Sequence, residues 1–207
     1  MIISFEGLDG CGKSTQIGLL SAVLNEHGKK VKVLREPGGN RISEKIRDLL
    51  LDKENDSMCR ETELLLYIAS RAQLVREEIK TLLEDNCIVI LDRFADSTTA
   101  YQGYGREIDL DVIDVLNDFA TERGKYMPDI TFFLDMPADL SLSRMVSRGE
   151  EINRMESSDK HFFERVREGF ITISENEPER VIRIEASGSA DKVYVQIEKI
   201  LKSRNII

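Results

Sequence analysis

The first residues with clear chemical potential lie in a glycine-rich segment near the start of the chain. In GLDGCGKST, residues 7–15, the residues Gly7, Gly12, Lys13 and Ser14 match the pattern G-x-x-x-x-G-K-[ST]. In such a loop, backbone N–H groups surround a β-phosphate, the lysine bridges the β- and γ-phosphates, and the hydroxyl binds Mg²⁺. The pattern therefore predicts an ATP site made of Gly7, Leu8, Asp9, Gly10, Cys11, Gly12, Lys13, Ser14 and Thr15.

Asp92 and Arg93 help to separate phosphoryl transfer from hydrolysis. Asp92 ends the apolar run CIVIL, where a carboxylate orients the water shell of Mg²⁺, so we expect Ser14 and, through water, Asp92 at the metal. Motor and regulatory ATPases usually place a water-activating carboxylate next, whereas Arg93 has no base function. Its guanidinium is suited to hold a second phosphate, although an ion pair with Asp92 is the plainer alternative. A phosphate monoester with a second pKa near ~6 is already a nucleophile at neutral pH, so we predict a kinase for a phosphorylated small molecule.

Two further groups of side chains are candidates for holding the acceptor. Tyr67 and Arg71 are four residues apart on one helical face, where an aromatic ring and a planar multi-donor group suit a heterocyclic base. By periodicity alone, Tyr67 is more often a plain core residue and Arg71 a surface charge, so the pair by itself is weak evidence. Thr98, Tyr101 and Gln102 follow Arg93 at i, i+3, i+4 spacing, which places two hydroxyls and an amide on one face.

The segment VLREPGG is predicted to make a tight turn beside these residues. Glu36 ends an apolar run, Pro37 fixes the turn, and two glycines permit close approach of the backbone. A cis Glu36–Pro37 bond is possible in such a turn, but base rates favour trans. Arg47 follows on the next helical pattern.

Composition limits the possible partners. The chain has 207 residues and a net charge of −9, which argues against nucleic-acid or anionic-membrane surfaces. The three cysteines Cys11, Cys59 and Cys87 are odd in number and lack metal-ligand spacing, as in a reducing cytosol. No apolar run approaches the roughly 18–20 residues of a membrane span, and no secretory signal is evident. We expect one domain, residues 1–207, in the cytoplasm, with no nucleic-acid or membrane partner.

Short β-branched runs alternate with longer helical patterns, which predicts a parallel α/β sheet. The expected strands are 2–6, 31–36, 87–92, 130–135 and 181–185. The first helix should run from about residue 14 to Gly28, with Ile17, Leu20 and Leu24 on one face. Segment 61–84 is apolar on more than one side, so it should be buried on two sides, within the domain or at a subunit contact.

Five stretches of this sequence resemble thymidylate kinases in order and spacing: GLDGCGKSTQ, LREPGG, LLYIASRAQ, LDRFADSTTAYQG and RGEEINRME. The resemblance covers nearly the whole chain. It implies the three-layer P-loop nucleoside-monophosphate kinase fold, with a five-stranded parallel sheet flanked by helices and a short lid at about 144–158. It also implies transfer of a phosphoryl group from ATP to dTMP with Mg²⁺, giving dTDP and ADP for dTTP biosynthesis, and usually a homodimer.

The resemblance assigns roles around the base of dTMP. Tyr67 takes the place of a phenylalanine that stacks on thymine, and its added hydroxyl must be satisfied. Arg71 corresponds to the donor to a thymine carbonyl, with Thr98 and Gln102 near the base edge. Tyr101 is placed where the family crowds the 2′ position.

The same resemblance assigns the sugar and the acceptor phosphate. Asp9 matches the acidic loop residue that reaches the 3′-hydroxyl. Arg47 and Arg93 match the residues that hold the acceptor phosphate, and Glu36 lies beside them.

Thymidylate kinases differ in whether the arginine for the transferring phosphate is in the phosphate loop or in the lid. Here the loop position is Gly10, whereas the lid region has Arg144, Arg148 and Arg154. The chain resembles the lid style, with Arg154 as the best match, although these arginines could simply pair with neighbouring glutamates on the surface. The predicted catalytic residues are Lys13, Arg93, Arg148 and Arg154.

Two other functions remain open on the residues alone. A deoxynucleoside kinase shares the loop and a Glu-Pro turn, and there Glu36 would act as a base on a 5′-hydroxyl. Arg93 followed by SxxAYQG favours a monophosphate acceptor instead. A non-catalytic ATP-binding module would leave Arg47, Arg93 and the lid arginines without a task.

Cys11 is a separate candidate for chemistry. It lies beside Lys13 near a helix N-terminus, an environment that lowers a thiol pKa and favours oxidation. The plainer interpretation is a small residue that fits the loop.

Overall fold

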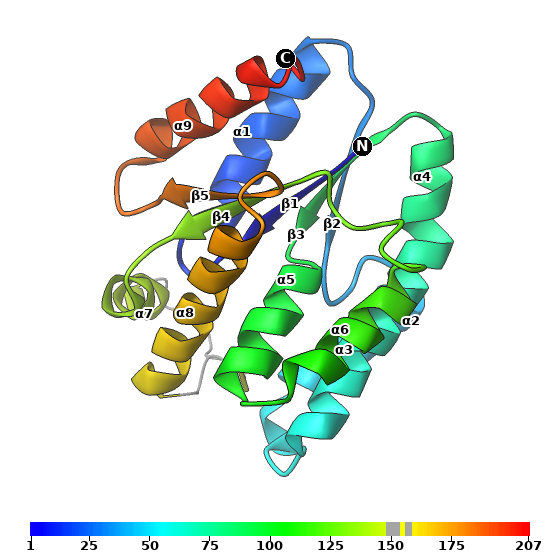
Figure 1. Cartoon of the computed structure of the whole chain (residues 1–207), viewed down its shortest axis with the longest axis vertical. Coiled ribbons are helices and arrows are strands. Elements are labelled where there is room, and N and C mark those ends of the chain that lie inside the picture. Colours follow the sequence, from blue (N-terminus) through cyan, green and yellow to red (C-terminus); the bar gives the residue numbers. More distant parts are fainter. Residues whose placement is uncertain (148–153, 156–158) are drawn as a thin grey trace.

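The computed structural model describes residues 1–147, 154–155 and 159–207. Five strands form one parallel sheet in the order β2-β3-β1-β4-β5, with β1 at its centre (Figure 1). The strands are β1 Ile2–Glu6, β2 Val31–Arg35, β3 Ile88–Asp92, β4 Ile130–Asp135 and β5 Val181–Glu185. Because parallel neighbours need long crossover connections, helices join the strands and cover the sheet.

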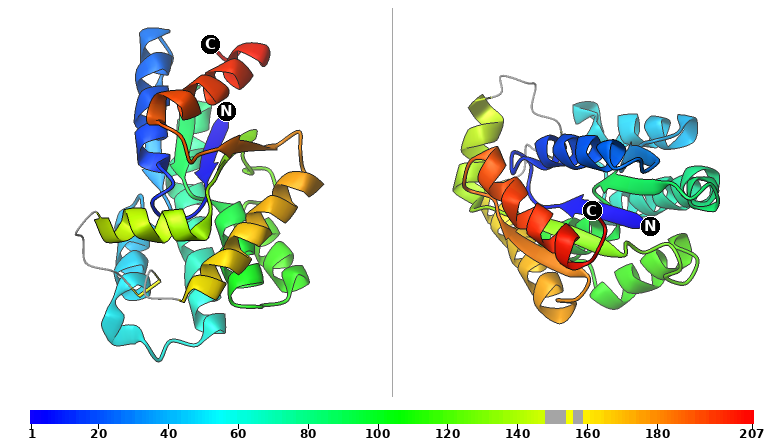
Figure 2. Two further views of the ribbon diagram at one scale, coloured as in Figure 1. Left: turned by 90° about the vertical axis from the view of Figure 1, so that its left-hand side faces the viewer. Right: turned by 90° about the horizontal axis from the view of Figure 1, so that it is seen from above.

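Helices lie on both faces of the sheet (Figures 1 and 2). The α-helices are α1 Lys13–Glu26, α2 Arg41–Leu51, α3 Arg60–Leu74, α4 Lys80–Glu84, α5 Ala95–Thr98, α6 Leu110–Ala120, α7 Ala138–Ser147, α8 Lys160–Asn176 and α9 Ala190–Ser203. A 3₁₀ turn, η1 Lys53–Asn55, and two π-helical segments, η2 Val75–Ile79 and η3 Thr99–Gly105, complete the described elements. None of the helices in the described ranges combines the length and apolarity that crossing a bilayer requires.

The core forms on both sides of the sheet because successive strand residues point to opposite faces. Ile3 and Phe5 of β1 pack with α1 and α9, and the neighbouring Ile2 packs with α3 and η2 on the other side. On that second side, Phe133 of β4 stacks on Phe170 of α8. The three-layer α/β fold predicted from the sequence is confirmed, while its being a single domain stays a prediction.

Most element boundaries follow the predictions. β1, β4 and β5 have the predicted bounds, β2 ends one residue early at Arg35, and β3 begins one residue late at Ile88. The first helix begins at Lys13 and ends at Glu26 rather than at Gly28. Its predicted inner face is buried, as Ile17, Leu20 and Leu24 all belong to the core.

Segment 61–84 consists of three consecutive helical segments, α3, η2 and α4. It is buried on two sides, as predicted: Leu64 and Ile68 pack against Ile113 of α6, and Leu74 and Ile79 pack against the sheet. This places the Tyr67–Arg71 face of α3 beside the carboxyl ends of the strands.

The predicted lid, 144–158, lies mostly outside the described residues. Its first four residues, 144–147, belong to the last turn of α7. Arg154 and Met155 are described and both are buried.

Candidate active site

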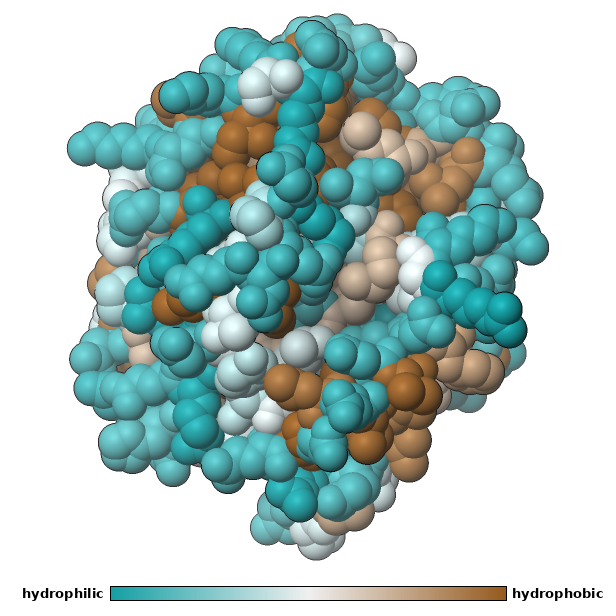
Figure 3. All heavy atoms as spheres, viewed as in Figure 1, coloured by the Kyte–Doolittle hydropathy of each residue, from teal (hydrophilic) through white to brown (hydrophobic). Residues whose placement is uncertain are grey.

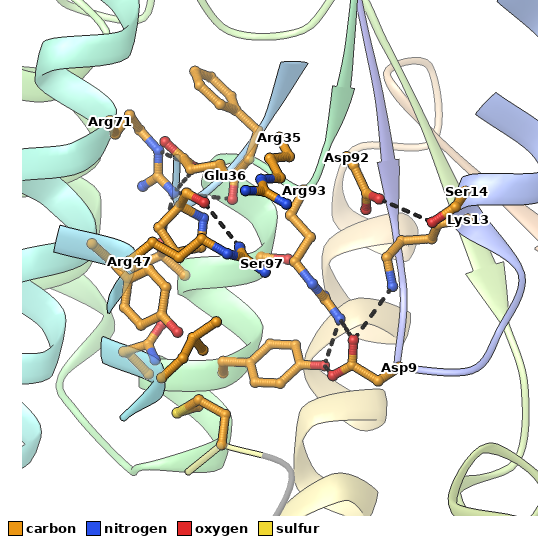
Figure 4. A pocket seen from close by; sticks show the side chains of 18 of the residues that line it. Asp9, Lys13, Ser14, Arg35, Glu36, Arg47, Arg71, Asp92, Arg93 and Ser97 are labelled. Atoms are coloured by element: carbon orange, nitrogen blue, oxygen red, sulfur yellow. Dashed lines mark hydrogen bonds and ion pairs between the residues drawn. The ribbon is translucent and has the colours of Figure 1, made fainter. Parts of the chain in front are cut away.

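A cavity opens at the carboxyl ends of β1, β2 and β3, the edge at which parallel α/β sheets bind ligands (Figure 4). It lies between the phosphate loop, α2, α3 and η3. Its lining residues are Asp9, Gly10, Gly12, Lys13, Ser14, Arg35, Glu36, Pro37, Arg47, Leu51, Tyr67, Arg71, Asp92, Arg93, Phe94, Ser97, Thr98, Tyr101, Gln102 and Met155.

The phosphate loop connects β1 to α1. Gly12 immediately precedes the helix with a φ of 99°, in the left-handed region that favours glycine. Lys13 is buried and curls back, its Nζ donating to the carbonyl of Gly7 at 3.2 Å and that of Leu8 at 3.0 Å. The ammonium group thus lies inside the loop, at the N-terminus of α1. A phosphate bound there would interact with both the Lys13 charge and the positive end of the helix dipole.

Close packing of α7 shapes the other side of this loop. A Cβ on Gly10, whose φ is 84°, would lie 2.9 Å from the carbonyl oxygen of Ser141. The Ser141 hydroxyl in turn donates to the carbonyl of Asp9 at 2.5 Å. The loop conformation therefore depends on glycine at position 10.

Ser14 and Asp92 lie together at the mouth of the loop. The Ser14 hydroxyl donates to Oδ2 of Asp92 at 3.4 Å (Figure 4). A hydroxyl and a carboxylate are the oxygen ligands that Mg²⁺ takes, usually one or two from protein with the rest from water and phosphates. In the described ranges, no group of three or more His, Cys, Asp or Glu side chains could enclose a metal alone. The pair therefore fits a Mg²⁺ ion that arrives with a nucleotide.

Arg93 pairs with Asp9 across the cavity, rather than with Asp92. Its Nη2 lies 2.7 Å from Oδ1 of Asp9 and donates to the hydroxyl of Tyr101 at 3.1 Å, while Nη1 donates to the carbonyl of Gly7 at 2.9 Å. Arg93 has a φ of 71°, unusual for a bulky residue, as the chain turns out of β3. Burial would raise the pKa of Asp9, but Arg93 and Lys13 lower it to about 2.

Arg71 anchors the wall beside β2. Its Nε and Nη2 donate to Oε2 of Glu36 at 3.0 and 2.5 Å, and Nη2 donates to Oγ1 of Thr98 at 2.8 Å. Nη1 donates to Oδ1 of Asn117 at 2.5 Å. Since Nη1 has two hydrogens, one N–H has no acceptor among the described residues. Despite Arg71, burial raises the pKa of Glu36, and its Oε1 has no partner in the described ranges.

Three guanidinium groups line the phosphate side of the cavity: Arg35, Arg47 and Arg93. Nη1 of Arg47 donates to the carbonyl of Pro37 at 2.9 Å, which holds the side chain over the turn. Burial and the nearby charge of Arg35 lower the pKa of Arg47. A half-buried cation such as Arg47, beside other cations, is stabilised by an anion, so this cluster suits a phosphate group.

Arg154 lies away from the loop, against α3. Its Nη2 is 2.7 Å from Oε2 of Glu63, and Nε donates to the carbonyl of Leu50 at 2.8 Å. Its neighbour Met155 does line the cavity, and the sulfur of Met155 accepts from Nη2 of Arg106 at 3.5 Å. The predicted catalytic cation is thus held by a glutamate, and Arg148 lies outside the described residues.

Comparisons with known proteins identify the family of this chain. The family model described as thymidylate kinase matches residues 5–197. A thymidylate kinase of Chlorobaculum tepidum is 47% identical over 205 residues, 95% of this chain and 94% of that protein. One of Fervidobacterium nodosum is 43% identical, over 98% of this chain and 99% of that protein. The crystal structure of a thymidylate kinase from Ehrlichia chaffeensis matches with a TM-score of 0.78 and 37% identity, covering 98% of each chain.

The chain belongs to the thymidylate kinase family. The predicted enzyme, a kinase that phosphorylates dTMP with ATP, is confirmed by membership of this family. The residues alone left two alternatives open, a deoxynucleoside kinase and a non-catalytic ATP-binding module. Neither is the family to which the chain belongs.

Every residue predicted to contact dTMP lines this cavity. Among the predicted ATP residues, Asp9, Gly10, Gly12, Lys13 and Ser14 line it too. Gly7, Leu8 and Cys11 are buried residues of the loop that do not line the cavity, and Thr15 is exposed on α1. The lining residues not predicted include Arg35, Phe94, Ser97 and Met155. Arg35 was detectable as a cation at the carboxyl end of a strand, and Ser97 as a hydroxyl one turn after Arg93.

Two expectations from the sequence are wrong. The Glu36–Pro37 bond is cis rather than trans, since proline lowers the cost of the cis form enough for a tight turn to adopt it. The environment of Cys11 does not lower its thiol pKa, because burial raises it more than Lys13 and Arg93 lower it. Only 3% of Cys11 is exposed, which favours the packing interpretation.

Proposed function

We propose that the cavity binds dTMP and that the phosphate loop holds ATP, so that the phosphates of the two substrates meet at Lys13 and Arg93. The observation that carries this proposal is the convergence of Lys13, Arg35, Arg47 and Arg93 on one cavity, in a chain whose net charge is −9. Such a local concentration of cations is suited to bringing two anions together.

In the proposed reaction, an oxygen of the acceptor phosphate attacks the γ-phosphorus of ATP in line with the bond to the bridging oxygen, which breaks to release ADP. Arg47 and Arg93 hold the acceptor phosphate, and Lys13 neutralises charge on the β- and γ-phosphates. The acceptor needs no general base because it is already ionised at neutral pH. Asp9 is placed to accept from the sugar 3′-hydroxyl.

Mg²⁺ bound with ATP would be held by Ser14 and, through water, by Asp92. When bound, the ion supplies positive charge at the β- and γ-phosphate oxygens. The 3.4 Å contact between these two side chains supports a shared role.

The base is proposed to lie against Tyr67, with Thr98 and Gln102 at its edge. Arg71 donates its remaining Nη1 hydrogen to the carbonyl at position 4. Tyr101, held beside Arg93, crowds the 2′ position and disfavours a ribose.

Arg154 and Arg148 are proposed to supply positive charge to the transferring phosphate. For Arg154, this role requires the guanidinium to leave Glu63 when ATP binds, because it is paired there now.

A homodimer is proposed through α3 and α6. Apolar side chains gather over this region (Figure 3), where Leu65, Val112, Val115 and Phe119 are all about half exposed or more. Val115→Arg should give monomers in sedimentation at a concentration where the unaltered chain is dimeric, because a buried unpaired charge is costly. Val195→Arg on α9, an equally exposed site, is the control. If the unaltered chain sediments as a monomer, the proposal is contradicted.

The enzyme is further proposed to work in the cytoplasm, without nucleic-acid or membrane partners. All three cysteines are free, and the acidic net charge disfavours polyanionic surfaces.

The test of the proposed pocket is ADP release from Mg·ATP with dTMP, dUMP, thymidine, AMP, CMP and no acceptor. Turnover should be strongest with dTMP, and Arg47→Ala should raise the KM for dTMP without changing that for ATP. Release that does not depend on an acceptor, or that needs thymidine, would overturn the assignment of Arg47 and Arg93 to the acceptor phosphate.

A further inference from the structure

Glu63 is a buried carboxylate that the roles above leave unused. It lies on α3 one helical turn before Tyr67, and only 1% of it is exposed. Oε1 accepts from Nε2 of Gln102 at 2.9 Å and from Nε of Arg106 at 3.2 Å, while Oε2 pairs with Nη2 of Arg154 at 2.7 Å. One carboxylate therefore ties the Gln102 wall of the cavity to α3.

The charge state of Glu63 decides what its neighbour can do. Burial alone would raise its pKa, but Arg106, with Gln102 and Arg154, brings the pKa below the ordinary value. An ionised carboxylate can only accept hydrogen bonds. The atom of Gln102 that faces Glu63 must therefore be the amide nitrogen, which donates.

The other end of the amide then faces the cavity. Gln102 is 1% exposed and lines the cavity, and in the described part of the chain its Oε1 has no hydrogen-bond partner. Arg71, whose Nη1 keeps one N–H without an acceptor among the described residues, lines the same cavity. The wall therefore offers one donor and one acceptor in a fixed order.

We propose that Glu63 is a positioning residue that sets base selectivity by fixing the orientation of the Gln102 amide. This inference rests on the proposed binding of dTMP. A base with a carbonyl at position 4 beside an N3–H, as in thymine or uracil, satisfies both Arg71 and Gln102. Cytosine has an amino group at position 4 and an unprotonated N3, so it presents a donor to Arg71 and an acceptor to Gln102. Both contacts then fail.

The test is Glu63→Gln, which keeps the shape but can donate as well as accept, so that the amide of Gln102 is free to turn. The measured quantity is the ratio of kcat/KM for dTMP to that for dCMP, with dUMP as an acceptor that has the same edge as dTMP. We expect this ratio to fall at least about tenfold, because a buried hydrogen-bonding group that is left mispaired is costly. The ratio of dTMP to dUMP should stay unchanged, because the methyl group is not read by Gln102.

Glu61→Gln is the matched control, since Glu61 lies on the same helix but is exposed and pairs only with Arg60 among the described residues. Gln102→Met supplies a double-mutant cycle. In that background, Glu63→Gln should change the dTMP to dCMP ratio no further. A purely structural role for Glu63 would lower kcat/KM for all acceptors equally and leave the ratio unchanged, which would overturn the proposal.

The unaltered enzyme provides a check that does not depend on the folding of a variant. It should use dUMP far better than dCMP, and equal use of these two would overturn the proposal. Failure of the proposed pocket is distinguishable, because Gln102→Met would then leave the KM for dTMP unchanged. If Glu63→Gln does not fold, Glu63→Asp keeps the charge but draws the carboxylate away from Gln102, and it should lower the same ratio less.

Discussion

Two regions of the pocket wall each depend on one buried carboxylate, Glu36 at the end of β2 and Glu63 on α3. Their exposed fractions are 3% and 1%, yet the pKa of Glu36 is raised and that of Glu63 is lowered. In the described part of the chain, Glu36 is bonded by Arg71 alone, whereas Glu63 is bonded by Gln102, Arg106 and Arg154. Burial alone therefore does not decide the direction in which the pKa of a carboxyl group shifts; the charges and donors around the group contribute as well.

Removing Arg154 tests whether this side chain belongs to the reaction or only to the Glu63 region. If Arg154 is the cation for the transferring phosphate, Arg154→Ala should lower kcat roughly 10³-fold. The KM for ATP should change little, because the contact is made in the transition state. Steady-state kinetics with dTMP measures both. A near-normal kcat with a raised KM for dTMP would assign Arg154 to the support of Glu63 instead, and Arg144→Ala is the control for loss of charge nearby.

Removing one cation should lower the free energy of unfolding more when the cation pairs with Glu36 than when it pairs with Glu63. Arg71→Ala leaves Glu36 buried without a counter-charge and should lower the free energy of unfolding by about 3–5 kcal/mol. Arg106→Ala leaves Glu63 with two donors and should cost only about 1–2 kcal/mol. Urea denaturation measures both. Adding Glu36→Gln to Arg71→Ala should restore part of the loss, and equal losses for the two single variants would contradict the comparison.

A third buried carboxylate, Glu6, extends the comparison to pH. Burial, with nearby Asp96, raises its pKa from 4.5 to about 8, although the Phe94 N–H and the Ser97 hydroxyl donate to it. Between these two values the folded state keeps a proton that the unfolded state has lost. Stability should therefore fall as pH rises from about 4.5 to about 8. Glu6→Gln should flatten that part of the profile in denaturation measured across the window, and an unchanged slope would refute the assignment.

The smallest effect is expected at Tyr67, next to Glu63 on α3. Burial, with Glu63 acting in the same direction, raises the pKa of the Tyr67 hydroxyl, so it stays neutral. The hydroxyl makes no hydrogen bond to any described residue. Tyr67→Phe should therefore change the KM for dTMP by no more than about twofold. Tyr67→Ala removes the ring and is the contrasting variant; a large effect of Tyr67→Phe would show that the hydroxyl contacts the nucleotide.

The sequence was sufficient for the sheet because its signals are local. Apolar runs with polar ends define β1, β4 and β5 to the residue, and glycine spacing identifies the phosphate loop. The residues predicted to contact dTMP all line the cavity; strand ends and shared helical faces indicated some of them, and the family resemblance supplied the others.

Pairing between distant side chains was not predictable. Arg93 has Asp92 beside it in the chain but pairs with Asp9, 84 residues away, because the turn at its positive φ directs the side chain across the cavity. The contact between Glu63 and Arg154 likewise joins segments that no local pattern connects. Such pairs depend on how segments far apart in the chain pack together, which spacing along the chain does not encode.

The close contact between Gly10 and α7 limits how this enzyme could evolve. An arginine at position 10 would give the loop-arginine style of the family in a single substitution. Here its Cβ would meet the carbonyl of Ser141 at 2.9 Å, in a backbone conformation that side chains rarely adopt. In this chain, an arginine at position 10 therefore also requires a shift of α7 or of the loop, so the single substitution starts at a disadvantage.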